Sequence, residues 1–196
     1  MENNKDFKIK ILIVGPLLTN CYLLSSRNEA MVIDPDGEVE NIFKEIKKEN
    51  IKVRYIVNTH FHPDHILENK SLKRKTGAKI LIHEKEKDFI SFHPDKFLKG
   101  GDKIKFGDVS FLVIDTPGHT KGSLSLFGNG FLFTGDLLFA DGIGRTDLLG
   151  GNEKEIKKSL NKISKFLKAG INVCPGHGDI FKVSKSGLDM NSFLKN

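Results

Sequence analysis

The sequence predicts an α/β protein built from two mixed sheets with helices on their outer faces. Two features support this class, and a third bears on the number of domains. Short apolar runs alternate with longer segments of helical period, which is typical of α/β units. A block of closely spaced apolar runs, separated by turn residues, adds antiparallel strands. No repeat or linker-like segment divides the 196 residues, so we expect one domain over residues 1–196.

The first half of the chain alternates between strands and helices. Apolar runs bounded by turn residues predict strands at residues 7–14, 20–25, 30–33, 53–58 and 78–82. The apolar stripe Val39, Ile42, Phe43 and Ile46 predicts a helix over residues 38–50. A second helix is expected over residues 66–75, and a short one over residues 84–92.

The second half begins with the strand-rich block. Strands are expected at residues 104–106, 109–115, 123–127, 131–134 and 171–174. Residues 128–130 read Gly-Asn-Gly, which is a hairpin signal between two of these strands. Apolar residues at positions 156, 160, 163 and 167 predict an amphipathic helix over residues 152–169.

The composition limits the partners and the compartment. The formal net charge is +6, carried mostly by scattered lysines, and no arginine-rich run with interleaved aromatic residues is present. We therefore expect a small-molecule substrate rather than nucleic acid. No apolar stretch approaches the ~18 residues that span a membrane. The polar amino terminus and the well-separated Cys21 and Cys174 favour a cytoplasmic protein without membrane contact.

The most informative segment is Thr-His-Phe-His-Pro-Asp-His at residues 59–65. It follows an apolar strand and holds four side chains that can bind a metal: His60, His62, Asp64 and His65. Imidazole and carboxylate groups together suit a divalent metal such as zinc. A chain that turns at the end of a strand can direct such a cluster at one point.

Three further candidate ligands stand in the same context. His119, Asp136 and His177 each follow an apolar strand closely. Sites in open α/β layers form outside the carboxyl ends of strands, so these strand ends indicate one shared site. His83 and His93 match no cluster and are expected to be structural or surface residues. Substrate contact and an ordinary structural role stay equally open for Lys121, Arg145 and Thr146.

The combined motifs resemble the metallo-β-lactamase fold superfamily. They are His-x-His-x-Asp-His at residues 60–65, Pro-Gly-His-Thr at 117–120, Thr-Gly-Asp at 134–136 and Pro-Gly-His-Gly at 175–178. The segments Gly-Asp-Leu-Leu-Phe at 135–139 and Gly-Ile-Gly-Arg-Thr-Asp at 142–147 are similar to small single-domain members of the glyoxalase II-like group. The resemblance covers nearly the whole chain in the right order.

The resemblance implies an αβ/βα four-layer sandwich with a two-metal site at one edge. By that resemblance, one metal is held by His60, His62 and His119, the other by Asp64, His65 and His177, and both by Asp136. Asp64 is also expected to orient the hydroxide that the two metals share during catalysis. Zinc is the first expectation for both ions, with iron or manganese as alternatives.

The implied function is metal-dependent thioester hydrolysis, similar to that of hydroxyacylglutathione hydrolase. The alternative is a persulfide dioxygenase of the same fold, with one iron on His60, His119 and Asp136. The ligand positions alone do not separate the two. A nucleic-acid-processing enzyme ranks last, because 196 residues leave no room for an appended RNA-binding region.

Two departures from the resemblance bear on the substrate. Full-length glyoxalase II enzymes carry a C-terminal helical region that contacts glutathione, whereas only residues 178–196 follow His177 here. We therefore expect that region to be missing. Lactam hydrolases of this fold lack a bridging aspartate and are exported, so Asp136 and the polar amino terminus argue against β-lactamase activity.

Overall fold

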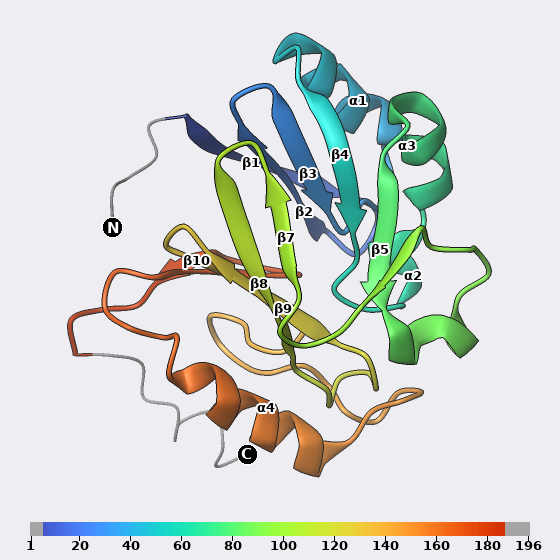
Figure 1. The fold of residues 1–196 in the computed structure, drawn as a ribbon. Coiled ribbons are helices and arrows are strands. Elements are labelled where there is room, and N and C mark those ends of the chain that lie inside the picture. Colours follow the sequence, from blue (N-terminus) through green and yellow to red (C-terminus); the bar gives the residue numbers. More distant parts are fainter. Residues whose placement is uncertain (1–5, 187–196) are drawn as a thin grey trace.

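Two six-stranded sheets lie face to face in the computed structural model, which describes residues 6–186 (Figure 1). The first sheet contains β1 Phe7–Val14, β2 Thr19–Ser26, β3 Glu29–Ile33, β4 Lys52–Val57, β5 Lys79–His83 and β6 Lys96–Leu98. The second contains β7 Lys103–Phe106, β8 Val109–Asp115, β9 Leu124–Gly128, β10 Phe131–Gly135, β11 Asn172–Pro175 and β12 Phe181–Lys182. The predicted pair of mixed sheets is confirmed.

Each sheet mixes the two strand directions. In the first sheet, the strands follow chain order, with antiparallel pairs from β1 to β3 and parallel pairs from β3 to β6. In the second sheet, β7 to β10 form an antiparallel meander, β11 is parallel to β10, and β12 closes the edge. Parallel neighbours need a crossover, which brings helices onto the outer faces.

The helices are α1 Val39–Lys48, α2 Pro63–Ile66, α3 Asn69–Thr76, the 3₁₀ helix η1 Glu84–Phe89, and α4 Glu153–Ser164. In Figure 1, α1 and α3 lie beside the first sheet, and α4 lies against the second. Three apolar clusters separate these layers: one between the sheets, one under α1 and α3, and one under α4. This arrangement is the four-layer αβ/βα sandwich that was expected.

Several predicted boundaries were wrong for local reasons. The helix expected over residues 66–75 is two helices, and the first begins inside the motif at Pro63, where the fixed backbone of proline suits a first turn. The helix expected over residues 152–169 ends at Ser164. Strands β6 and β12 were not predicted, because three and two residues are too short to show an alternating pattern.

Backbone hydrogen bonds join the strand ends of the two sheets at one edge. Leu124 N–H donates to Thr59 O at 2.9 Å, and Asn20 N–H donates to Gly176 O at 2.7 Å. Within residues 6–186, no helix is both long and apolar enough to cross a membrane. The expected absence of a C-terminal helical region concerns residues 178–196, and positions 187–196 lie outside the described residues.

Candidate metal centre

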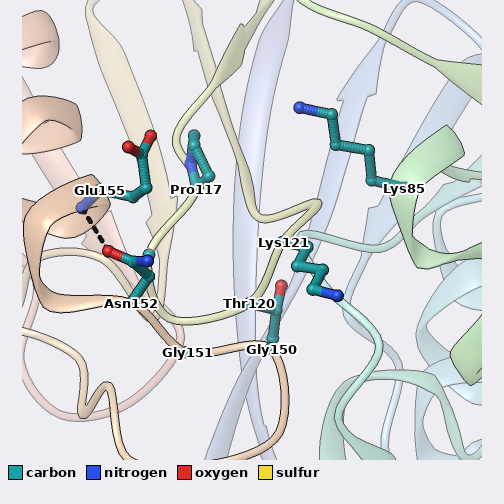
Figure 2. A pocket seen from close by; sticks show the side chains of 9 residues that line it. Lys85, Pro117, Thr120, Lys121, Gly150, Gly151, Asn152 and Glu155 are labelled. Atoms are coloured by element: carbon teal, nitrogen blue, oxygen red, sulfur yellow. Dashed lines mark hydrogen bonds between the residues drawn. The ribbon is translucent and has the colours of Figure 1, made fainter.

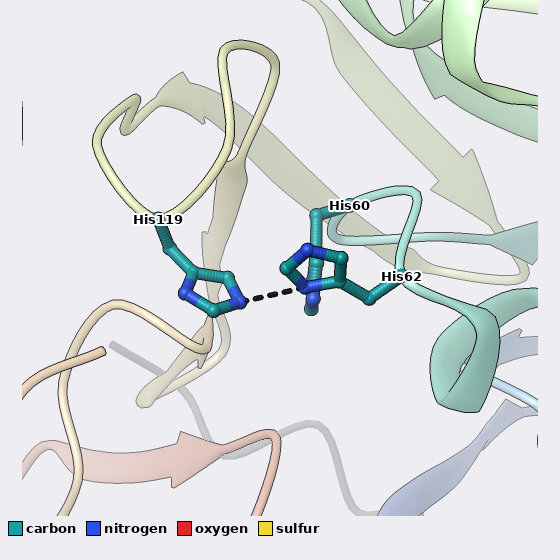
Figure 3. Close-up of side chains that lie close together, drawn as sticks. All are labelled: His60, His62 and His119. Carbon is teal, nitrogen blue, oxygen red and sulfur yellow. Dashed lines mark hydrogen bonds between the residues drawn. The ribbon is translucent and has the colours of Figure 1, made fainter. Parts of the chain in front are cut away.

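Three histidines from the two sheets meet at the joined edge. His60 and His62 follow β4, and His119 follows β8. Figure 3 shows their rings turned toward a common point. His62 Nδ1 lies 2.9 Å from His119 Nε2, and the His60 ring centroid lies 4.8 Å from each of the other two. One ligand atom of each lies within 4.8 Å of the others, so the three can share a single cation.

A second group lies next to the first. Asp64 and His65 belong to α2, and His177 follows β11. His177 Nε2 lies 3.1 Å from Asp64 Oδ2 and 3.3 Å from His65 Nε2. His65 Nε2 is 3.3 Å from the same Asp64 oxygen. These three side chains also offer ligand atoms within 4.8 Å of one another.

Asp136 lies between the two groups. One carboxylate oxygen, Oδ2, is 3.5 Å from His119 Nε2 and 3.6 Å from His177 Nε2. The other, Oδ1, is 3.6 Å from His65 Nε2. His60, His65 and Asp136 form a third compatible group. The structure therefore brings all seven sequence-predicted ligands together, with Asp136 in the position of a bridge.

Several donor atoms of the described site lack a protein partner, and a divalent cation would supply the missing contact. His60 Nε2 and Asp136 Oδ1 are buried and have no hydrogen-bond partner among the described residues. Buried polar atoms are nearly always paired, so such orphans need an explanation. Nitrogen atoms of His62 and His119 face each other at 2.9 Å, where two lone pairs repel unless a proton or a metal lies between them. Imidazole and carboxylate ligands are those that zinc and iron accept.

Outer partners fix the rings of the candidate ligands. Asp34 lies 2.9 Å from His65 Nδ1 and accepts hydrogen bonds from the Thr59 backbone and hydroxyl, both at 2.7 Å. His119 Nδ1 lies 2.8 Å from Arg145 O, and His177 Nδ1 lies 3.0 Å from Leu17 O. Such contacts fix the tautomer and orientation of metal-binding histidines. Sequence reasoning missed Asp34, although it ends a strand just as Asp136 does.

The His177 loop requires glycine at position 176. A Cβ on Gly176 would overlap Asp136 Oδ1 and lie 2.8 Å from His65 Cε1. The absent side chain lets the backbone pass directly behind two candidate ligands. The Pro-Gly-His motif is therefore explained by packing at the site.

The pKa shifts of the metal-free site differ between its two halves. Burial alone would lower the pKa of His65 and His177, but neighbouring carboxylates raise both pKa values. These carboxylates are Asp34, Asp136 and Asp64 for His65, and Asp64 and Asp136 for His177. A metal must therefore displace protons there.

The other shifted groups of the site are in metal-binding protonation states. Burial lowers the pKa of His60 well below its ordinary value, and burial with the nearby His119 lowers that of His62 to about 4. Burial alone would raise the pKa of Asp64, but hydrogen bonds from His177 and His65 hold it below its usual range. Neutral imidazoles and ionised carboxylates are the forms that bind metals.

The three candidate substrate contacts differ in their surroundings. Lys121 lines an open cavity of about 530 Å³ with Lys85 and the start of α4 (Figure 2). The Arg145 guanidinium instead pairs with Asp147 at 2.7–2.8 Å, and its backbone carbonyl contacts His119. Thr146 lies on the same loop and is half-buried. Of the three, only Lys121 lines this cavity, and none of the seven candidate metal ligands lines it.

The two remaining histidines lie outside the three groups that could hold a metal. His83 is buried, lies 3.1 Å from Asp115 Oδ1, and accepts the Lys85 N–H at the start of η1. His93 is exposed.

Comparison with known proteins places the chain in a family. The Metallo-beta-lactamase superfamily model matches residues 14–177, so the chain belongs to that superfamily. An uncharacterized protein from Aquifex aeolicus is 36% identical over 87% of this chain and 90% of its own length. The hydroxyacylglutathione hydrolase GloC of Haemophilus influenzae is 29% identical over 95% and 97%. Membership of the superfamily and these relatives indicate that this protein is a metal-dependent hydrolase.

Solved structures of similar sequence share the fold. The BLEG-1 B3 metallo-beta-lactamase aligns with a TM-score of 0.84 and 29% identity, over 89% of this chain and 94% of that one. ETHE1 from Myxococcus xanthus aligns with a TM-score of 0.82 and 27% identity, over 89% of this chain and 79% of that one. TTHA1623 in a di-iron-bound form aligns with a TM-score of 0.80 and 27% identity, over 88% of this chain and 94% of that one. The fold binds divalent metals, and this chain carries the His/Asp clusters for them.

Proposed function

We propose that this protein hydrolyses thioesters with two divalent metal ions. The observation that carries the proposal is the position of Asp136, within 3.6 Å of ligand nitrogens in both histidine groups. A carboxylate in that place can neutralise and join two cations. The similarity to GloC, which is named a hydroxyacylglutathione hydrolase, supports a thioester as the substrate.

In this proposal, His60, His62 and His119 hold one ion, Asp64, His65 and His177 hold the other, and Asp136 contacts both. Zinc is the preferred ion because imidazole and carboxylate donors suit it. Iron is the second choice, because the similar TTHA1623 has a di-iron-bound form. Bound cations would polarise the thioester carbonyl and supply a nucleophile at neutral pH.

The protein's own groups have separate tasks beside the ions. Asp64 accepts a hydrogen bond from the Thr19 hydroxyl at 3.3 Å and remains ionised, so it can accept a hydrogen bond from the attacking water and orient it. Lys121 lies with Lys85 on the wall of the cavity beside the His119 loop, where an ammonium group attracts an anionic part of a substrate. Arg145 fixes His119 through its backbone carbonyl.

The second candidate is a mono-iron persulfide dioxygenase. The similarity to ETHE1 from Myxococcus xanthus favours it, at 27% identity and a TM-score of 0.82. It would use only His60, His119 and Asp136 as ligands. The first candidate needs both groups of ligands, so the two differ in metal stoichiometry as well as in substrate.

One preparation with defined metal content tests both candidates. We expect protein loaded with two zinc ions to hydrolyse S-lactoylglutathione and other small thioesters. We expect the same protein loaded with iron to consume no oxygen when glutathione persulfide is added. A β-lactam is the third substrate, because BLEG-1 is named a lactamase. Oxygen uptake or lactam hydrolysis without thioester turnover would refute the proposal.

A further inference from the structure

Glu86 is a buried carboxylate next to the metal centre that the chemistry described so far does not use. It belongs to η1, and it is fully buried. A carboxylate almost never occupies such a place unless its charge is compensated by hydrogen bonds. Its surroundings therefore show what it is for.

Three donors from two loops point at this carboxylate. Phe61 N–H donates to Oε2 at 2.9 Å. The Thr120 hydroxyl donates to Oε1 at 3.1 Å, and Gly122 N–H donates to the same oxygen. Phe61 lies between His60 and His62, and Thr120 follows His119. One side chain thus joins the two loops that carry the three-histidine group.

The three contacts favour the ionised form of Glu86, and the fit requires a small neighbour. The two backbone N–H groups can only donate, so a protonated carboxyl group would find a possible acceptor only in the Thr120 hydroxyl among the three. Burial raises the pKa of Glu86, and the bonds from Gly122, Thr120 and Phe61 oppose that rise. A Cβ at position 122 would lie 2.5 Å from Oε1, so the carboxylate and a glycine at 122 depend on each other.

The rest of the centre has other supports. Asp34 contacts Thr59 and His65, and Asn20 bonds the loop around His177. Among the described contacts of Glu86, none reaches the loop of His177 or helix α2, which carries Asp64 and His65. Its direct hydrogen bonds therefore support the loops of the three-histidine half.

We propose that Glu86 is a positioning residue that holds His60, His62 and His119 in register and so sets the metal affinity of the three-histidine half. The inference rests on the metal centre of the proposed function and not on its substrate. Loss of an outer partner of this kind typically weakens metal binding about 10–100-fold.

The test compares Glu86→Gln with a matched control. Glutamine keeps the shape but turns one acceptor oxygen into a donor, so one loop loses its partner. Glu29→Gln is the control, because the Glu29 carboxylate also accepts a distant backbone N–H, from Gly107 at 2.9 Å, but serves no ligand loop. Zinc is titrated into metal-free protein against a chromophoric chelator, and the histidine ring signals are followed by NMR.

We expect Glu29→Gln to bind two zinc ions, each with the affinity that it has for the wild-type protein. Glu86→Gln should bind one ion normally and the second about 10–100-fold more weakly. The ring signals of His62 and His119 should be the ones that require the higher zinc concentration. Two unchanged affinities in Glu86→Gln, or equal weakening of both halves, would overturn the inference.

Thr120→Val is a milder variant that keeps the test decisive if Glu86→Gln does not fold. It removes one of the three donors and preserves the side-chain shape. We expect weaker zinc binding at the same half, and wild-type zinc binding by Thr120→Val would overturn the inference. A wild-type protein that binds neither zinc nor iron would refute the proposed function itself, whereas wild-type zinc affinity in every variant would refute the role of Glu86 alone.

Discussion

Asn20 joins the first sheet to the loop that carries His177, and its replacement should loosen that loop. The buried side-chain amide donates to Pro175 O at 3.1 Å and to Gly178 O at 2.9 Å, on either side of His177. Asn20→Ala removes both bonds and leaves the backbone bond from Asn20 N–H to Gly176 O in place. The strands should therefore remain, while His177 loses part of its support.

The two bonds set the size of the effect. Each hydrogen bond of this type contributes about 0.5–1.5 kcal/mol, so Asn20→Ala should lower the free energy of unfolding by about 1–3 kcal/mol. The lower half of that range is expected, because Pro175 O keeps the Tyr22 hydroxyl at 2.6 Å and the exposed Gly178 can bond to water. Metal binding by the Asp64, His65 and His177 group should weaken by about 10–100-fold.

Denaturant unfolding of the metal-free protein measures the free energy of unfolding, and zinc titration measures the metal affinity. Asn172→Ala is the matched control, because the Asn172 side chain also donates to a backbone carbonyl, that of Gly130 at 3.5 Å, away from the site. The control should lose less than about 1 kcal/mol of stability, as expected for one long bond, and retain both zinc affinities. Unchanged zinc binding in Asn20→Ala would refute the idea that this amide positions His177.

Three other predictions concern the whole centre. Asp136→Asn should abolish most activity and bound metal, because it removes the charge between the two groups, whereas the exposed His93→Ala should retain both in the same assays. A strong chelator should lower the melting temperature, since a metal held at 100 times its Kd stabilises the native state by about 2.7 kcal/mol; an unchanged temperature after verified metal removal would contradict a shared site. In metal-free protein, burial and His119 lower the pKa of His62 from 6.5 to about 4, so this residue's own contribution to stability should fall as the pH drops through that window, whereas the raised pKa values of His65 and His177 act in the opposite sense. His62→Gln should lose less stability than wild type as the pH drops from 6.5 to about 4, and equal slopes would count against it.

The fold and the candidate ligands were largely predictable from the sequence because both depend on local patterns. Short, mainly apolar runs bounded by turn residues marked strands such as β8. The ligands follow such strands within a few residues, as His60 follows β4. A motif that lies at a strand end can be located once the strand is recognised, which is why the structure brings all seven predicted residues together.

The supporting residues could not be predicted, because their partners are distant in the chain. Asn20 lies 155 residues from Pro175, and Glu86 lies 25 residues from Phe61 and 36 from Gly122. Their roles depend on which loops meet after folding, and the apolar periodicity of the sequence does not show that. Arg145 shows the same limit, since its side chain pairs with Asp147 and its useful contact with His119 comes from the backbone.

The centre is divided between the two sheets in a way that links metal binding to folding. His60, His62, Asp64 and His65 come from the first sheet and its connections, whereas His119, Asp136 and His177 come from the second. Each three-ligand group therefore contains residues from both sheets. A cation in either group joins the sheets at the edge where their shared apolar cluster ends and polar groups begin. Because the unfolded chain cannot bring these ligands together, metal affinity adds directly to the stability of the sandwich. The buried groups that hold the ligand loops, Glu86 for one half and Asn20 for the other, therefore affect stability and metal binding together, and measuring both in one variant separates their contributions.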